Sequence, residues 1–240
     1  MPTLEQWRAF YDGWAGGDPL LASTGTHVPF DDFTRLGDTL AGWLQLRGDE
    51  QALDVGCASG TLTSKWAGRA GRVVGVDFSA RLCAEANARH AGTNLTFTAA
   101  EAAALPFATA SFDRVVCFNV LLSLPDAGYA TRAMDELLRV ARPTARIVFG
   151  SLPDVRCQDR FFEVLRAASP WPRRVAARVR DLLRGGERRT TAILWFDIPG
   201  LCARFTAAGW NVEVHEDPPF ANYRHYRRSL VLSRRTELET

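Results

Sequence analysis

The feature that most constrains the fold is a regular alternation of short apolar segments and helical patterns between residues 51 and 150. Strands are predicted at 51–55, 72–76, 94–98, 112–118 and 145–150, and helices at about 60–69, 79–90 and 126–141. Apolar strands that alternate with helices form a parallel sheet that is covered on both faces. In sheets of this kind ligands bind beyond the carboxyl ends of the strands.

The segments on either side of this alternation complete one α/β domain. Helices are predicted at 4–14, where apolar residues have helical spacing, and from Asp31 to about Leu46, where they could cover the sheet end as a lid. After residue 150, helices are expected near 158–168, 172–184 and 198–208, and strands at 210–214 and 229–233. The expected parts are a lid (1–48), a cofactor-binding core (49–150), a helical insertion (151–197) and a C-terminal helix with two strands (198–240).

Composition limits the partners and the compartment. The 29 Lys and Arg residues nearly balance the 27 Asp and Glu residues, so net charge gives no argument for nucleic acid. The five cysteines are widely spaced and contain no C-x-x-C pair, which predicts free thiols in a reducing compartment and no metal site. The N-terminus does not resemble a signal peptide, and the longest apolar stretch, 115–124, is too short to cross a bilayer. A cytoplasmic location without a membrane partner is expected.

The stretch from Ala52 to Gly60 is predicted to be a strand that ends at a carboxylate and opens into a turn of small residues. Small residues let the backbone approach a ligand closely. The spacing of a phosphate-binding P-loop does not occur in the sequence. A dinucleotide turn needs glycine where this chain has Ala58 and Thr61. The pattern that remains is Asp-x-Gly-x-Ala-x-Gly.

Together with three later segments, this turn resembles the class I S-adenosylmethionine-dependent methyltransferases, most closely the small-molecule branch that includes the ubiquinone/menaquinone-biosynthesis type. The four matching segments begin at Leu53, Val76, Ala100 and Ser111, and each lies at the end of a predicted strand. The resemblance implies a three-layer αβα Rossmann-like fold with a mostly parallel seven-stranded sheet and an antiparallel last strand. It also implies S-adenosyl-L-methionine as cofactor, S-adenosyl-L-homocysteine as product, and methyl transfer to an O, N or C nucleophile of a small molecule.

The same resemblance implies a role for each position that matches the family's motifs. Asp54 and the backbone of the turn would hold the methionyl end of the cofactor, and Asp77 would accept hydrogen bonds from the ribose hydroxyls. Phe78 would pack on the adenine, and Glu101 would bind its edge. The predicted cofactor-binding residues are Tyr11, Asp54, Gly56, Cys57, Ala58, Gly60, Asp77, Phe78, Leu82, Glu101, Ala102, Asn119 and Leu121.

Two positions depart from the family pattern. Glu101 stands where the family usually has Asp, and its longer side chain can still accept a hydrogen bond from the exocyclic amine. The usual Pro-Gly-Gly before the fifth strand is replaced by Pro143-Thr144-Ala145, which puts the local turn geometry in doubt.

The sequence does not identify the methyl acceptor. His27 is a weak candidate for a base, and an ordinary loop histidine is the favoured interpretation. The arginines between 173 and 189 favour a solvated helix face over a site for nucleic acid or an acidic substrate. Trp171, Trp195 and Phe196 could line a substrate pocket or form lid core.

Three alternatives for function and assembly remain open at this point. An RNA or protein methyltransferase would need a contiguous basic surface, and the Asn-Pro-Pro-Tyr type of tetrapeptide linked to base methylation is absent. A non-catalytic cofactor-binding module would keep the turn and its carboxylates. A homodimer is compatible with the sequence, whereas a nucleic-acid partner is not expected.

Overall fold

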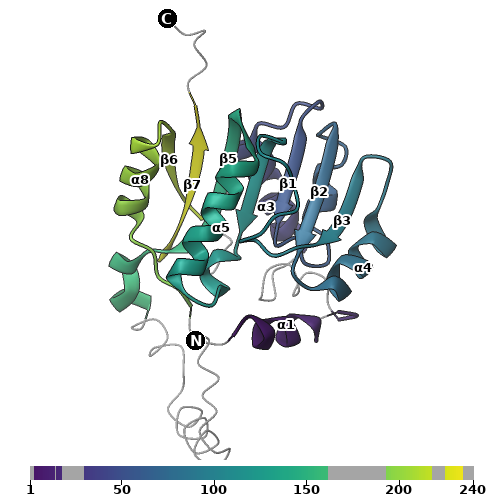
Figure 1. Ribbon diagram of the computed structural model, residues 1–240, viewed down its shortest axis with the longest axis horizontal. Helices are drawn as coiled ribbons and strands as arrows, with labels where there is room; N and C mark the ends of the chain where they lie inside the picture. The colour runs from purple at the N-terminus through teal and green to yellow at the C-terminus, as the bar shows by residue number, and fades with distance from the viewer. Residues whose placement is uncertain (1–2, 14, 18–29, 162–192, 218–224, 235–240) are drawn as a thin grey trace, which may run out of the picture.

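The computed structural model describes residues 3–13, 15–17, 30–161, 193–217 and 225–234. Its centre is a seven-stranded sheet in the order β3-β2-β1-β4-β5-β7-β6 (Figure 1). The strands are β1 (Gln51–Val55), β2 (Arg72–Asp77), β3 (Leu95–Ala99), β4 (Phe112–Phe118), β5 (Ala141–Pro153), β6 (Asn211–Glu216) and β7 (Arg227–Ser233). All seven strands lie where the sequence predicts them, to within a few residues.

The first five strands are parallel, and β7 runs antiparallel to both β5 and β6. The predicted fold, with its antiparallel last strand, is confirmed. Because β7 is reversed, its first residues lie beside the last residues of β5, where Pro153 pairs with Arg227. The carboxyl ends of six strands, β1 to β6, and the amino end of β7 therefore meet at one edge of the sheet.

Residues that alternate along each strand fill two separate hydrophobic cores, as the period of a buried strand requires. Leu53 and Val115 face one core, and Ala52 and Val116 face the other. The first core is covered by α5 (Ala127–Val140) and α8 (Ile198–Ala207), and the second by α3 (Phe30–Leu44) and α4 (Ala80–His90). In Figure 1, α5 lies in front of the sheet and α3 behind it. The three-layer architecture follows.

Helix α1 (Leu4–Asp12) belongs to neither layer and lies across the carboxyl edge of the strands (Figure 1). It begins with a capping box, in which the Thr3 side chain accepts from the backbone N–H of Gln6 and the Gln6 side chain accepts from that of Thr3. It contacts α4 beyond the end of β2. The first predicted helix thus covers the edge where ligands bind in such sheets.

The prediction of a helix at 60–69 is wrong, because only a short 3-10 helix, η1 (Thr63–Trp66), forms there. Three hydrogen bonds to other parts of the chain hold this segment. The Thr63 hydroxyl donates to Asp54, and the Asn94 amide donates to the carbonyls of Ala67 and Ala70. Gly68 adds a further cost to helix formation.

The departure at Pro143-Thr144-Ala145 has a visible consequence. Strand β5 begins directly after α5 at Ala141, and the pairing with β4 shifts between Phe112 and Arg114. The family's turn is therefore replaced by an irregular extension of the strand.

Of the insertion helices expected near 158–168 and 172–184, the second and most of the first lie outside the described residues. In the described parts no helix is long and apolar enough to cross a membrane.

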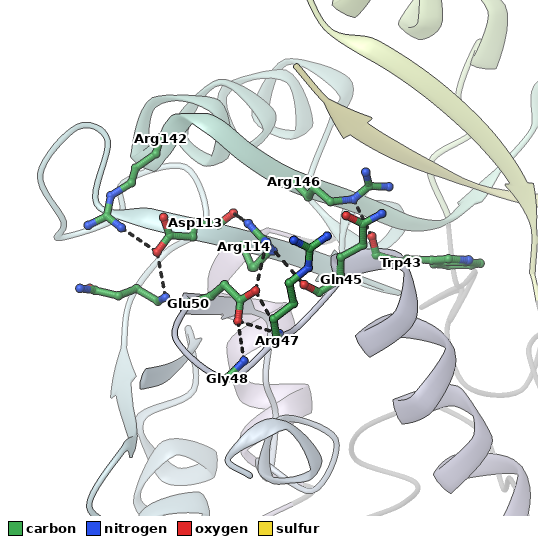
Figure 2. A network of polar contacts seen from close by, with 10 residues as sticks. Trp43, Gln45, Arg47, Gly48, Glu50, Asp113, Arg114, Arg142 and Arg146 are labelled. Atoms are coloured by element: carbon green, nitrogen blue, oxygen red, sulfur yellow. Dashed lines mark hydrogen bonds and ion pairs between the residues drawn. The ribbon is translucent and has the colours of Figure 1, made fainter. Parts of the chain in front are cut away.

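At the opposite edge of the sheet a buried polar network joins the end of α3 to β1, β4 and β5 (Figure 2). The Glu50 carboxylate is 5% exposed and accepts hydrogen bonds from the backbone N–H groups of Arg47 and Gly48. It also pairs with Arg114 at 3.1 Å. Arg146 donates to the carbonyl of Trp43 near the last turn of α3. Burial alone would raise the pKa of Glu50, but these backbone and guanidinium contacts lower it overall.

We expect Glu50→Ala to reduce the free energy of unfolding by about 2–5 kcal/mol, because it leaves buried N–H groups and the Arg114 guanidinium without their acceptor. Urea denaturation measures the loss. Glu216→Ala, which removes an exposed carboxylate beside Arg228, is the matched control and should change stability by no more than about 0.5 kcal/mol. Equal effects of the two substitutions would contradict the structural role of Glu50.

Candidate active site

The predicted turn after β1 wraps around the end of β2. The backbone N–H groups of Gly56 and Cys57 both donate to the carbonyl of Val76, at 2.7 and 2.9 Å. Three small residues of the turn, Gly56, Ala58 and Gly60, have φ of 84°, 48° and 75°. These left-handed conformations explain why the turn needs residues with small or absent side chains.

Asp77 ends β2 beneath this turn and is 7% exposed. One carboxylate oxygen accepts from the backbone N–H of Ala58 at 3.0 Å, and the other accepts from that of Ser79 at 2.9 Å. Burial raises the pKa of Asp77 to about 6, against the lowering effect of these two hydrogen bonds. The backbone therefore holds the Asp77 carboxylate in one orientation at the carboxyl edge.

Asp54, in β1, is a second buried carboxylate close to the first. It is 4% exposed and accepts a hydrogen bond from the Thr63 hydroxyl at 2.6 Å. Burial raises the pKa of Asp54 to about 7, against the lowering effect of the Thr63 hydrogen bond and with a smaller contribution from the charge of Asp77. Among the described residues no Lys or Arg forms an ion pair with either carboxylate.

These two carboxylates fit S-adenosyl-L-methionine chemically. Buried acids without a cationic partner destabilise each other, and a ligand that brings positive charge and hydroxyl donors relieves that cost. The cofactor has an ammonium group, a sulfonium and a ribose diol. Asp54 and the turn would hold the amino-acid end, and Asp77 would accept from the diol.

Helix α1 brings further predicted residues to this edge. The Tyr11 ring packs edge-on against Phe78, with centroids 5.7 Å apart. Burial raises the pKa of the Tyr11 hydroxyl, although a hydrogen bond with Ser123 partly opposes this. Asp12 accepts a short hydrogen bond from the hydroxyl of Ser79, the residue that caps α4. The lid helix is thus tied to the segment that follows Asp77.

Glu101 lies at the rim of the site with its side chain 39% exposed. One oxygen pairs with Arg8 at 3.2 Å, and the other accepts from the Tyr129 hydroxyl at 3.1 Å. Burial and the Glu101 charge raise the pKa of Tyr129 to about 12, which keeps it a hydrogen-bond donor. Ala102 follows and is half-buried. The Glu101 side chain is therefore held in place from α1 and α5, two contacts that the sequence did not indicate.

The remaining predicted residues include three buried side chains. Leu82 and Leu121 are fully buried, and Leu82 packs with Ala58 and next to Tyr11. Cys57 is also buried, and burial raises the pKa of its thiol well above the usual range. A nucleophilic thiolate at Cys57 is accordingly not supported. His27 lies outside the described residues.

Asn119 follows β4 and adopts a left-handed conformation, with φ of 60°. Its side-chain oxygen accepts from Arg227 at 2.6 Å. Arg227 lies 108 residues later in the sequence, and no spacing rule connects the two. The structure therefore joins to the site a buried cation that sequence reasoning missed.

Comparison with known proteins agrees with this geometry. Residues 52–144 match the family described as "Methyltransferase domain". The chain is 34% identical over 62% of its length to a 27-O-demethylrifamycin SV methyltransferase of Amycolatopsis mediterranei. It is 32% identical over 68% of its length to a demethylmenaquinone methyltransferase of Thermobifida fusca. It spans 59% of the first relative's length and 69% of the second's.

A solved structure shows the same fold. It is the magnesium protoporphyrin IX methyltransferase of Synechocystis with S-adenosyl-L-homocysteine bound, which superposes with a TM-score of 0.58 at 21% identity over 96% of this chain and 94% of that one. The chain belongs to the class I S-adenosylmethionine-dependent methyltransferases, and its named relatives act on small molecules. The predicted family and its cofactor, S-adenosyl-L-methionine, are confirmed.

The raised pKa of Asp54 gives the stability a defined pH dependence. Since folding raises this pKa from near 4 to about 7, the contribution is complete below about pH 4 and is lost as the pH rises through about 7. The full change is on the order of 4 kcal/mol for a shift of about three pKa units. Urea unfolding from about pH 4.5 to 7.5 should show this decline in the wild type and a smaller decline in Asp54→Asn, which retains the raised pKa of Asp77. Parallel profiles would contradict the buried, ionisable carboxylate.

Proposed function

We propose that the protein transfers the methyl group of S-adenosyl-L-methionine to an O, N or C nucleophile of a small molecule and releases S-adenosyl-L-homocysteine. The observation that carries this proposal is the pair of buried carboxylates, Asp54 and Asp77, at the ends of adjacent strands beneath a left-handed turn. The cofactor supplies an electrophilic methyl group on a positively charged sulfur. The protein then has to position the two reactants and exclude water.

The roles proposed for the chain follow from where its residues lie. Asp77, fixed by two backbone N–H groups, would orient the ribose. Asp54 would balance the charge of the amino-acid end. Tyr11 and Phe78, in edge-on contact, would exclude water from the adenosyl group. Glu101, held by Arg8 and Tyr129, would meet the adenine edge.

The acceptor class is proposed from two of the relatives, which are methyltransferases of 27-O-demethylrifamycin SV and of demethylmenaquinone. By analogy with these relatives, the chain would act on a small-molecule acceptor and would have no nucleic-acid or membrane partner. The five cysteines are free thiols, which supports the proposed cytoplasmic location because that compartment is reducing.

An acceptor screen that measures release of S-adenosyl-L-homocysteine tests the proposal. A small molecule should stimulate release by the wild type, and Asp77→Ala should lower the rate at sub-saturating cofactor. If RNA or a protein stimulates release instead, the acceptor class is wrong. If cofactor binds but no acceptor supports turnover, the non-catalytic alternative is favoured.

A further inference from the structure

A buried polar network lies at the carboxyl edge on the side away from the two carboxylates. Its centre is Arg227, the first residue of β7, which is 6% exposed. One terminal nitrogen of its guanidinium donates to Asn119 at 2.6 Å and to the hydroxyl of Ser151 at 2.9 Å. Residues after β4, in β5 and in β7 therefore converge on one cation.

The carboxylate of Asp217 also belongs to this network. This carboxylate is 3% exposed and accepts from the hydroxyls of Ser151 and Ser229, at 2.8 and 2.9 Å. The Ser229 hydroxyl in turn accepts from the backbone N–H of Ser151 at 3.0 Å. The Ser151 hydroxyl thus connects Arg227 to its buried counter-charge.

The backbone is strained at the two residues that contact Arg227. Asn119 and Ser151 have φ of 60° and 62°, a region that residues with a side chain rarely adopt. They are adjacent in space, since the N–H of Asn119 donates to the carbonyl of Gly150 at 3.1 Å. Ser151 also lies in a register shift between β5 and β7, and such bulges re-aim side chains next to active sites.

An aromatic cluster adjoins the same cation. Tyr226 packs against Phe161 and Trp195, with ring centroids 4.7 and 6.0 Å apart, and Arg227 lies 5.5 Å from the Tyr226 ring. This contact settles part of what the sequence left open, because Trp195 belongs to this cluster whereas Phe196 is buried in the core. Planar apolar side chains next to a fixed guanidinium suit a planar ligand with a negative group.

The two halves of the carboxyl edge therefore carry different charged groups. The β1 and β2 half carries two buried carboxylates and suits a cationic cofactor, while the β5 and β7 half carries a buried guanidinium together with the Asp217 carboxylate. We propose that Arg227, held by Asn119 and Ser151 beside the Tyr226 cluster, binds the methyl acceptor and selects a planar molecule with an ionised oxygen. This inference rests on the proposed function and adds the acceptor's chemical class. Arg227 would favour the deprotonated oxygen, so the site would not need a separate base.

Calorimetry on protein saturated with S-adenosyl-L-homocysteine tests the inference with matched probes. Naphthoate is compared with neutral naphthamide, and ionised pentafluorophenol with pentafluoroanisole. At least one ionised probe should bind about ten- to hundredfold more tightly than its neutral partner, as expected for a charge-assisted hydrogen bond. Preference in the first pair indicates a carboxylate acceptor, and preference in the second indicates a phenol or enol.

Variants separate binding from folding. Arg227→Met should abolish the preference for the ionised probe, and Arg227→Lys should retain part of it. Because Arg227→Met leaves Asp217 buried without its counter-charge, the double variant Arg227→Met with Asp217→Asn restores charge balance, and Asp217→Asn alone is its control. Affinity for S-adenosyl-L-homocysteine should stay within about twofold in every folded variant.

Three outcomes overturn the inference: equal binding of ionised and neutral probes, no binding of either ionised probe, or a preference that survives in the double variant. Each of these leaves cofactor binding intact and so leaves the proposed function standing. Failure of the wild type to bind S-adenosyl-L-homocysteine overturns the proposed function instead, and this inference with it.

Discussion

Asp77→Ala is expected to weaken binding of S-adenosyl-L-homocysteine by ten- to hundredfold or more, since hydrogen bonds to a charged acceptor contribute roughly 1.5–3 kcal/mol each. The variant also leaves the backbone N–H groups of Ala58 and Ser79 without their acceptor, which costs stability, and the removal of a buried acid with a raised pKa offsets part of that cost. Calorimetry measures the affinity, and urea unfolding of the same variant establishes that it remains folded.

The control for this substitution is Asp38→Ala. Asp38 lies on α3, is 55% exposed and pairs with Arg69 at the surface. Its removal should leave the affinity within about twofold of the wild type. Should Asp77→Ala bind the product as tightly as Asp38→Ala does, the assignment of the ribose to Asp77 is wrong.

Gly56→Ala is expected to disrupt both the fold and the cofactor turn. Gly56 has φ of 84°, and an added Cβ would lie 2.1 Å from Cγ2 of Val120. The left-handed backbone costs about 1–2 kcal/mol for alanine, and the overpacking about 1–3 kcal/mol more. The free energy of unfolding should therefore fall by about 2–5 kcal/mol. Urea denaturation tests this directly.

Two variants separate the causes. Gly68→Ala, where an added Cβ meets nothing within 4 Å, should leave stability unchanged or slightly raised. Gly56→Ala combined with Val120→Ala removes the clash but not the backbone strain, so it should recover only part of the loss that Gly56→Ala causes. A Gly56→Ala protein as stable as Gly68→Ala would contradict the geometry of the turn.

The sheet and the carboxylates at its edge could be predicted because they depend on local patterns. Apolar segments of strand length and their alternation with helices define the order of elements, and Asp54 and Asp77 each end such a segment. The helix predicted at 60–69 fails in a segment that tertiary hydrogen bonds hold, from the Thr63 hydroxyl to Asp54 and from the Asn94 amide to the carbonyl of Ala67. Periodicity within one segment does not report contacts from another.

The polar network around Arg227 could not be predicted, for the same reason. Arg227, Asn119 and Ser151 come from distant parts of the chain and meet only because β7 is reversed beside β5. Asparagine tolerates the left-handed conformation that Asn119 adopts, whereas the left-handed conformation of Ser151 has no sequence signal. Arg227 itself was one arginine among many in an arginine-rich chain.

The central claim is that the carboxyl edge of this sheet holds an adenosyl group joined to an amino acid. Titration of the protein with S-adenosyl-L-homocysteine in a calorimeter tests it most directly, and the pH can be varied in the same experiment. Saturable binding to one site is expected, with affinity that increases as the pH rises through about 6 to 7 and Asp77 and Asp54 become ionised. No binding at high micromolar concentration by either this product or S-adenosyl-L-methionine would contradict the account.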